Sequence, residues 1–461
     1  MEPSTVDKAP RVEAVPTAIG QFPSRGFRAL WLALSVSQFG SAVSVITIPV
    51  IAVVSLGATA QQMGVLTAMG VIPSFLIRVP AATWSDRLTR RVPLLAAINL
   101  TQATVIALIP LLWWRDALGF AVLLALIGMA SLLTGISSSL SSPILVDVVP
   151  KVHLVTANGR LSATRSVADI SGPGLGAALL AVLAAPFVVL ADAASFVLSA
   201  LLLTQVRERS AQPVTGDEAT AATTAPDHAS TDGGTTAGMP ATPVAAESAP
   251  SGTVRPEISV LGLGRALLGR TGVQALVAVA FVNGVVDPVL VLFMVRQLHL
   301  SASMIGVLLG LGAVGGVTGG LLVGRLMTRW GPGRTLAAGT AVTLASLAVL
   351  PFATRGFSGA AGVVVFELAG SLGGTLMVAT VFGLLQGAAP DGAVARVMAL
   401  AMTFLQVATV VGALAGGLLG TYLGLRSTLF VAAALFVVTL MPLLLAWRAA
   451  GWIFDEDREI R

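Results

Sequence analysis

Ionisable side chains are rare in the long apolar stretches of this sequence. Because these stretches are long enough to cross a membrane, each buried charge would cost about 2.5–3.5 kcal/mol on insertion scales, so each is a candidate for function. Asp287 and Glu367 are two acidic candidates, and Asn283 lies four residues before Asp287 on the same helix face. Pro288 adjoins Asp287 and disturbs the backbone there. A partly desolvated carboxyl group at either position could take up and release a proton.

Other interpretations of these two acids stay open. Asp287 could cap a broken helix or face outer water, and Glu367 could simply hydrogen-bond between helices. In the first apolar stretch, Arg165 and Asp169 are four residues apart and are predicted to neutralise each other as an ion pair. Asp192 is predicted to be a helix-contact residue.

Polar residues between two apolar segments suggest a different chemistry. A short loop holds an acid and three arginines: Asp86, Arg87, Arg90 and Arg91. An acid near the positive end of a helix, with arginines beside it, can form a clamp that breaks and reforms. Asp147 and Arg160 are spaced to meet across the next short loop on the same side, and we expect them to join this gate. The alternative is a solvated basic cluster that only fixes topology.

The composition excludes several classes of protein and of site. With 55% hydrophobic and 11% charged residues, the chain is not a water-soluble globule. It has no Cys and three His, each in an expected loop, so we expect no disulfide, no metal site and no cofactor. The basic residues are scattered between apolar runs, which argues against nucleic-acid binding. No nucleotide-binding loop and no nucleophile constellation is present, so we expect neither ATP drive nor an enzyme.

The apolar sequence predicts an all-α integral membrane protein with twelve transmembrane helices. A span needs about 20 apolar residues, and each of two long stretches accommodates six. The segment between them is rich in Ala, Thr, Ser, Gly and Pro and is predicted to be a disordered cytoplasmic linker. The predicted divisions are an N-terminal tail (1–28), a six-helix bundle (29–205), the linker (206–257), a second six-helix bundle with a lead-in segment (258–447) and a C-terminal tail (448–461).

The distribution of charge predicts that both termini are cytoplasmic. Most basic residues then lie on the inner side, which the positive-inside rule requires. Arg78 lies within a span, and four arginines are left outside: Arg115, Arg296, Arg355 and Arg426.

The two apolar stretches also resemble each other. A displacement of 240 residues places Gly172 on Gly412 and Gly176 on Gly416. This indicates a duplicated six-helix unit, typical of transporters whose site lies between two halves.

The segment 80–91 resembles the loop signature of the major facilitator superfamily. Asp86, Arg87, Arg90 and Arg91 match that signature, whereas Ala82 and Thr89 replace its two glycines. The resemblance implies two pseudo-symmetric six-helix bundles in which spans one, four, seven and ten line a central cavity. It therefore implies that Asp287 on span seven and Glu367 on span ten face that cavity. Gln38 on span one is expected to contact substrate.

Residues 157–161, 164–166, 172–173 and 192–196 look like the enterobactin-exporter and macrolide-efflux branch of that superfamily. Span five also partly matches the antiporter signature of family exporters, at Gly159, Gly172, Pro173 and Gly176. These small residues and the proline suggest a hinge, and ordinary close packing of helices is the alternative.

Together these features predict a proton-coupled exporter of bulky amphiphilic small molecules, such as drugs, macrolides or siderophores, working by alternating access. Its partners would be substrate, protons and the lipid bilayer of a bacterial inner membrane, and a monomer is expected. Span four lacks the arginine of the drug-antiporter signature, which leaves the coupling route open. Uptake by symport, or facilitated movement of a lipid, are the alternatives on the same fold. A non-transporting membrane sensor would need an extra folded domain, which we do not expect here.

Overall fold

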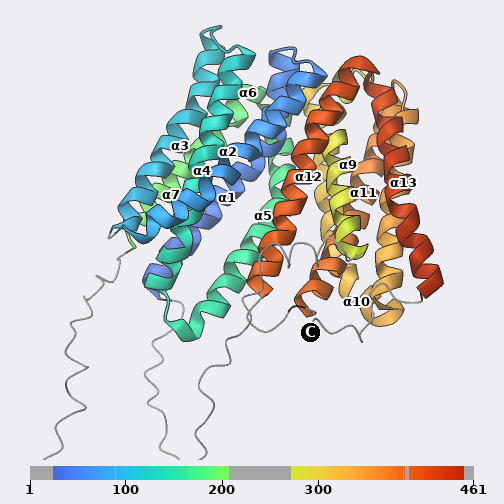
Figure 1. Ribbon diagram of the computed structural model, residues 1–461. Helices are drawn as coiled ribbons and strands as arrows, with labels where there is room; N and C mark the ends of the chain where they lie inside the picture. The colour runs from blue at the N-terminus through green and yellow to red at the C-terminus, as the bar shows by residue number, and fades with distance from the viewer. Residues whose placement is uncertain (1–23, 89, 207–270, 388, 390–393, 451–461) are drawn as a thin grey trace, which may run out of the picture.

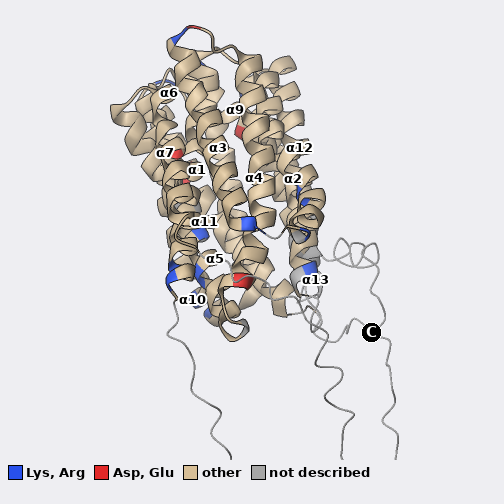
Figure 2. Cartoon of the chain, turned by 90° about the vertical axis from the view of Figure 1, so that its left-hand side faces the viewer, with Lys and Arg blue, Asp and Glu red and all other residues tan. Residues whose placement is uncertain are grey.

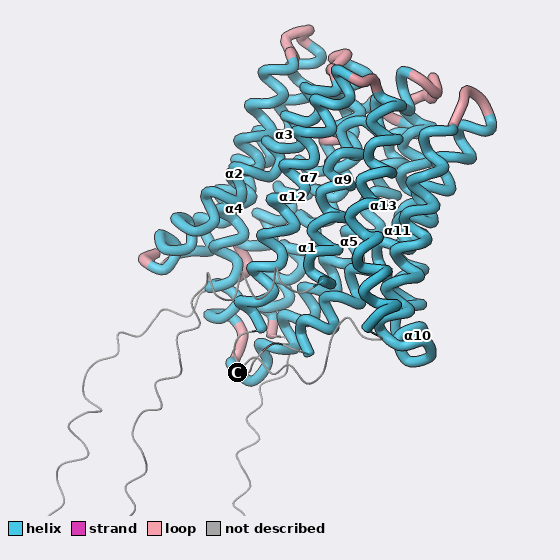
Figure 3. The backbone as a smooth tube through the Cα atoms, turned by 45° about the vertical axis from the view of Figure 1, so that its right-hand side comes forward, coloured by secondary structure: helices cyan, strands magenta, loops and turns pink. Residues whose placement is uncertain are grey.

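The computed structural model describes residues 24–88, 90–206, 271–387, 389 and 394–450. Within these ranges every regular element is a helix and there is no strand, as Figure 3 shows. This confirms the predicted all-α fold. The predicted linker and both predicted tails lie wholly or largely outside the described residues.

The first half of the chain forms seven α-helices (Figure 1). α1 runs directly into a short π-helix, and a 3-10 turn, η2 (Lys151–His153), precedes α5. α2 begins in a capping box, in which Thr59 and Gln62 each accept a hydrogen bond from the other's backbone N–H. The elements are α1 (Arg25–Val50), η1 (Ile51–Ser55), α2 (Ala60–Asp86), α3 (Arg91–Trp114), α4 (Phe120–Val148), α5 (Leu154–Val182), α6 (Ala185–Val188) and α7 (Leu190–Leu203).

The second half contains the remaining helices of the described chain. They are α9 (Thr271–Arg296), α10 (Ala302–Val349), the 3-10 turn η3 (Leu350–Phe352), α11 (Phe357–Gly387), α12 (Val394–Tyr422) and α13 (Leu425–Ala450).

α10 consists of two rods that fold back on each other at Gly331, whose φ of 80° is a left-handed conformation suited to glycine. Gly319, before the bend, packs against Leu372 of α11, and Gly339, after it, packs against Gly373 of the same helix. Both rods therefore lie against one stretch of α11. A break of this kind is expected where one span ends and the next begins.

Nine helices in the described chain are long and apolar enough to cross a membrane, and the longest of these includes both rods of α10. α5 and the described part of α13 fall outside that set, although each runs the length of the bundle in Figure 1. With α6 and α7 taken together as one crossing, the described chain runs between the two ends of the bundle twelve times. The described helices fall largely within the two predicted bundles, in the order that the sequence predicts.

The helix of span five extends beyond its apolar core. The sequence places that core at about residues 161 to 184, and α5 begins earlier, at Leu154. Asn158, Gly159 and Arg160 therefore belong to the first turns of a helix and not to a loop. Polar residues mark the edge of the apolar window, whereas a helix can continue beyond it.

Figure 1 shows the two halves side by side, with the N-terminal helices in blue to green and the C-terminal helices in yellow to red. The halves pack together mainly through α2 against α12 and α5 against α10. α1 begins and α7 ends at the same end of the bundle, which is the lower end in Figure 1. The turn between α1 and α2 lies at the other end, which we call the upper end.

The duplication is visible in the packing of small residues. Gly172 of α5 lies against Ala42 of α1, and Gly412 of α12 lies against the carbonyl oxygen of Phe281 of α9. Corresponding glycines thus let corresponding helix pairs approach closely in both halves. The repeated sequence register has a direct structural counterpart.

Candidate functional site

Two polar side chains in the middle of α9 are accessible although most of the helix is buried. α9 contains the most buried of the candidate membrane spans in the described chain. Asn283 and Asp287 are nevertheless exposed, while the residues next to them on either side are buried. Their spacing of four places them on one face, as the sequence predicts. The helix therefore presents one accessible polar stripe.

Glu367 of α11 lies close to this stripe. The carboxyl groups of Glu367 and Asp287 are near enough to interact electrostatically. Glu367 is half-buried and faces Gly312 on the first rod of α10, where an added Cβ would lie 2.6 Å from Oε2 of Glu367 and 3.0 Å from Oγ of Ser371. Three helices thus converge on two acids that are 80 residues apart in the sequence.

Neither acid has a compensating partner in the described part of the chain. The structure gives Asp287 and Glu367 no hydrogen bond or ion pair with another described residue, and the ion pair it does contain joins Arg91 and Asp147 elsewhere. An unpaired charge in a low-dielectric region is costly, and two like charges cost more. Such a pair is suited to binding a cation or a proton.

The upper end of the molecule is held closed by hydrogen bonds between the halves. Arg296, at the end of α9, donates from Nη2 to the carbonyl oxygens of Gly57 at 3.0 Å and Ala58 at 2.8 Å. The backbone N–H of Gln61 donates to Oγ1 of Thr421 at 3.1 Å. Between α10 and α5, the hydroxyl of Ser303 donates to the carbonyl oxygen of Leu180 at 3.1 Å.

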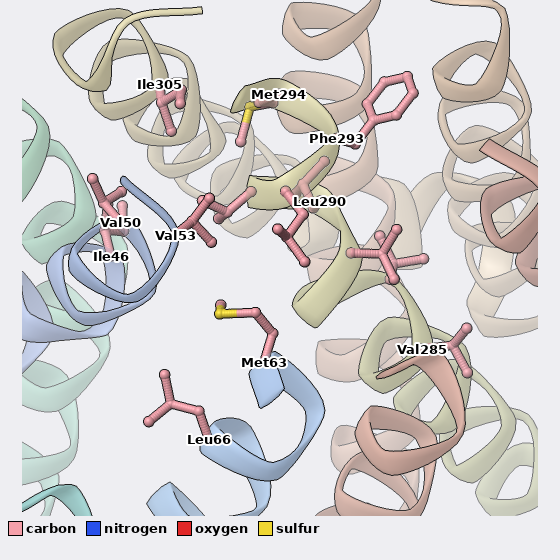
Figure 4. Close-up of a cluster of buried hydrophobic side chains, with 14 of the residues drawn as sticks. Ile46, Val50, Val53, Met63, Leu66, Val285, Leu290, Phe293, Met294 and Ile305 are labelled. Atoms are coloured by element: carbon pink, nitrogen blue, oxygen red, sulfur yellow. The ribbon is translucent and has the colours of Figure 1, made fainter. Parts of the chain in front are cut away.

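Close packing adds to this closure. A Cβ at Gly417 of α12 would lie 2.8 Å from the carbonyl oxygen of Ala60 and 3.2 Å from Cα of Gly64, so α2 and α12 touch through glycine. Figure 4 shows buried apolar side chains that meet at this end from both halves. They include Val50 and Val53 from α1 and η1, Met63 from α2, Leu290 and Met294 from α9, and Ile305 from α10.

The lower end is arranged differently. α4 and α11, which occupy corresponding places in the two halves, share no packed interface in the described chain. Basic residues lie mostly toward this end in Figure 2. The hydrogen bonds that join the two halves of the described chain therefore lie at the upper end.

The predicted gate at the lower end is only partly as expected. Arg91 donates from Nη1 to Oδ2 of Asp147 at 2.8 Å, and its Nε donates to the carbonyl oxygen of Ser85 at 3.0 Å. The expected pairing of Asp147 with Arg160 is wrong. Asp147 lies in the last turn of α4, which packs beside the start of α3, so its side chain lies close to that of Arg91. The Arg91–Asp147 pair lies within the first half and ties α3 to α4.

The side chains of the other predicted gate and ion-pair residues are only partly among the described ones. Arg87 and Arg90 are exposed between α2 and α3, and Arg160 is exposed on α5. The side chains of Asp86, Asp169 and Pro173 lie outside the described set, so the clamp at Asp86 and the Arg165–Asp169 pair stay predictions.

The glycines of span five divide into two groups. Gly172 and Gly176 lie against Ala42 and Val43 of α1. An added Cβ would collide at Gly172 and would make a tight contact at Gly176, so both glycines serve close packing. Gly159 has open space around it. This arrangement favours the packing interpretation at two of the three positions, and the hinge stays a prediction.

The remaining predicted contacts lie on α1. Gln38 is half-buried there, and one turn further along the hydroxyls of Ser41 and Ser44 bond to Asp192 of α7. The prediction that Asp192 makes a helix contact is confirmed, but nothing in the sequence spacing identified its serine partners. No group of three or more His, Cys, Asp or Glu side chains that could hold a metal ion occurs among the described residues.

Comparisons with known proteins agree with this architecture. The structure is similar to that of a bacterial homolog of the human lysosomal transporter Spinster in an inward-facing and unoccupied conformation, with 15% identity, a TM-score of 0.63 and 95% of this chain and 100% of that chain covered. It is similar to a bacterial homologue of the iron transporter ferroportin in an inward-facing state, with 18% identity, a TM-score of 0.61 and coverage of 91% and 99%. The nucleoside transporter NupG matches with 10% identity, a TM-score of 0.63 and coverage of 92% and 99%.

At these identities the likeness concerns the fold. No curated protein matches the chain. The family model described as Major Facilitator Superfamily, however, matches residues 30–268 and 273–458, which is nearly the whole sequence. The fold and the matched family are those of multi-pass membrane transporters. The chain therefore belongs to the Major Facilitator Superfamily.

Proposed function

We propose that this transporter is a proton-coupled exporter of bulky amphiphilic small molecules in a bacterial inner membrane. The observation that carries the proposal is the meeting of Asp287 and Glu367, two uncompensated acids, beside the accessible face of α9. Transport would proceed by alternating access of this site to the two sides of the membrane.

Proton exchange follows from the chemistry of the pair. Two ionised carboxylates that interact electrostatically repel each other, and a proton bound by either one relieves that repulsion. A substrate that binds at the same place displaces the proton, and a proton that returns displaces the substrate. Such competition for one site is sufficient to exchange substrate outward for protons inward.

The arrangement of the halves supports alternating access. If both termini are cytoplasmic, as the distribution of arginines predicts, the upper end faces the outside and the structure is closed there. Two of the similar structures are in inward-facing states. Opening the Arg296 contacts and the α2–α12 packing while the lower end closes would complete the cycle.

The substrate class rests on the character of the helices around the pair. α9, α10 and α11 carry mostly aliphatic and small side chains, with Asn283 and Ser371 as polar groups near the two acids. A sugar would leave many hydroxyls unpaired in such surroundings, whereas a bulky amphiphile would not. The resemblance of spans five and six to the enterobactin-exporter and macrolide-efflux branch favours the same class.

Accumulation in cells tests the proposal. A panel of bulky amphiphilic compounds would be measured in an efflux-deficient bacterium, with and without this protein, before and after addition of a protonophore. We expect at least one compound to accumulate less in cells that carry the protein, and the protonophore to abolish the difference. Increased accumulation would instead indicate uptake, and a reduction that survives the protonophore would exclude proton coupling.

A further inference from the structure

A second buried acid, Asp192, lies in the other half of the molecule and has no part in the scheme above. It occupies the first turn of α7 and is 2% exposed. A charged group so deeply buried is retained only with compensation. What surrounds it therefore indicates what it binds.

Three hydroxyl groups converge on this carboxylate from two helices. From α1, the hydroxyl of Ser44 donates to Oδ2 at 2.6 Å and that of Ser41 donates to Oδ1 at 3.3 Å. On α7 itself, the hydroxyl of Ser195 lies 3.5 Å from Oδ1 and donates to the backbone carbonyl oxygen of Asp192 at 2.7 Å. Two carboxylate oxygens and three hydroxyl oxygens thus form one cluster of hard ligands.

The cluster depends on a close approach of the two helices. A Cβ at Gly40 of α1 would lie 2.8 Å from Oδ1 of Asp192 and would overlap Oγ of Ser195. The absence of a side chain at this one position lets α1 bring its serines to the acid. The oxygen cluster is therefore built into the interface of α1 and α7.

Among the described residues, no basic side chain forms an ion pair with Asp192. α7 packs against α1, α3 and α6. On α1 the charged residues are Arg25 and Arg28, about 20 Å from Ser41 along the axis at 1.5 Å per residue. α3 carries Arg91, at its far end and paired with Asp147, while Arg115 lies exposed beyond its other end and α6 has no charge. The helix dipole at the start of α7 supplies only part of a charge.

We infer that Asp192, Ser41, Ser44 and Ser195 form a binding site for a small monovalent cation, Na⁺ in type. Carboxylate and hydroxyl oxygens are the ligands that hard cations take, and a single carboxylate matches a single positive charge. A proton needs one acceptor atom. A metal cation that has lost its water needs several oxygen ligands, and five oxygens converge here. The site lies in the half opposite to the Asp287–Glu367 pair and does not depend on the function proposed for that pair.

The position of the site gives cation binding a mechanical consequence. A cation would draw Ser41 and Ser44 toward α7 and so fix the upper half of α1. α1 continues through η1 to Gly57 and Ala58, whose carbonyl oxygens hold Arg296 of the other half. Occupancy of the site would thus favour the closed upper end.

The thermal unfolding midpoint of the purified full-length protein tests the inference. It would be measured in NaCl, KCl and choline chloride at equal ionic strength, each over a range of pH, for the parent protein and for Asp192→Asn and Ser44→Ala. Ser199→Ala is the matched control, because Ser199 is a buried serine of α7 that bonds to Asn99 of α3 and not to Asp192. We expect Na⁺ to raise the midpoint of the parent and of Ser199→Ala by a few degrees over choline.

The variants show whether the effect belongs to this site. The rise of the unfolding midpoint in NaCl should vanish in Asp192→Asn. In Ser44→Ala the same rise should require a higher Na⁺ concentration. If Asp192→Asn fails to fold, the parent and Ser44→Ala still decide the matter. Equal midpoints of the parent in NaCl and choline would overturn the inference, and so would a Na⁺ effect of the same size in Asp192→Asn or an unchanged Na⁺ requirement in Ser44→Ala. A difference between parent and variants that follows pH alone would assign the site to a proton and would also overturn it.

Discussion

Replacing Asp287 by Asn, or Glu367 by Gln, is expected to abolish transport driven by a pH gradient. Each amide keeps the size of the side chain and removes the group that exchanges a proton. The other carboxyl group then no longer interacts with a second negative charge. We expect the rate of proton-driven export to fall about tenfold or more, which corresponds to the usual coupling energy between two sites. The measurement is the rate of export in cells energised at acid external pH.

Two controls accompany this prediction. Asp116→Asn changes an exposed acid in the turn after α3, whose φ of 54° asparagine accepts readily, and should leave transport unchanged. Exchange of substrate between the two sides without a gradient should persist in Asp287→Asn, because binding and conformational change do not require net proton movement. Full pH-driven transport in both amide variants would show that these acids have no part in coupling.

Replacing Gly417 by Val is expected to keep the upper end open. The new side chain would press on the backbone of α2 at Ala60 and Gly64, which α12 touches only where the upper end closes. Overpacking of this kind costs about 1–3 kcal/mol. Because this cost applies only when the upper end is closed, it would shift the equilibrium toward the state with the upper end open by about 5- to 150-fold. The rate of transport would fall accordingly.

The absence of Cys in the sequence makes this shift measurable. A single cysteine at Asn283, on the accessible face of α9, should be shielded from a membrane-impermeant maleimide added outside the cell. The same cysteine should be labelled when Gly417→Val is present. Gly383→Val is the control, since open space surrounds Gly383 of α11. No gain of labelling with Gly417→Val would contradict the assignment of the upper end as the closed outer gate.

Much of the architecture follows from the sequence, because the signals that define it are local. Long apolar runs, interrupted by turns, determine the helices, and the described helices follow the expected order. The start of α5 at Leu154 escaped prediction because the helix extends past its apolar window. The repeat of Gly172 and Gly412 predicted the duplication, and the two glycines pack in corresponding places.

The candidate site could be predicted residue by residue but not as an assembly. Asp287 and Glu367 were each singled out by the cost of charge in a membrane, yet their proximity depends on how α9 and α11 pack. The partner of Asp147 depends on the same kind of packing, and spacing along the chain suggested Arg160 where the fold supplies Arg91. The contacts that close the upper end could not be predicted from the sequence, because Arg296 binds backbone carbonyl oxygens, which every residue has.

Proton movement in proteoliposomes tests the central claim most directly. The purified protein would be reconstituted with a pH-sensitive dye trapped inside, and a compound that the cell panel identifies as exported would be added to one side at zero membrane potential. The account predicts that substrate entry drives protons outward, that an imposed pH gradient accelerates substrate movement, and that Asp287→Asn abolishes both effects. Substrate movement at an unchanged rate with no dye response, with or without a pH gradient, would contradict it.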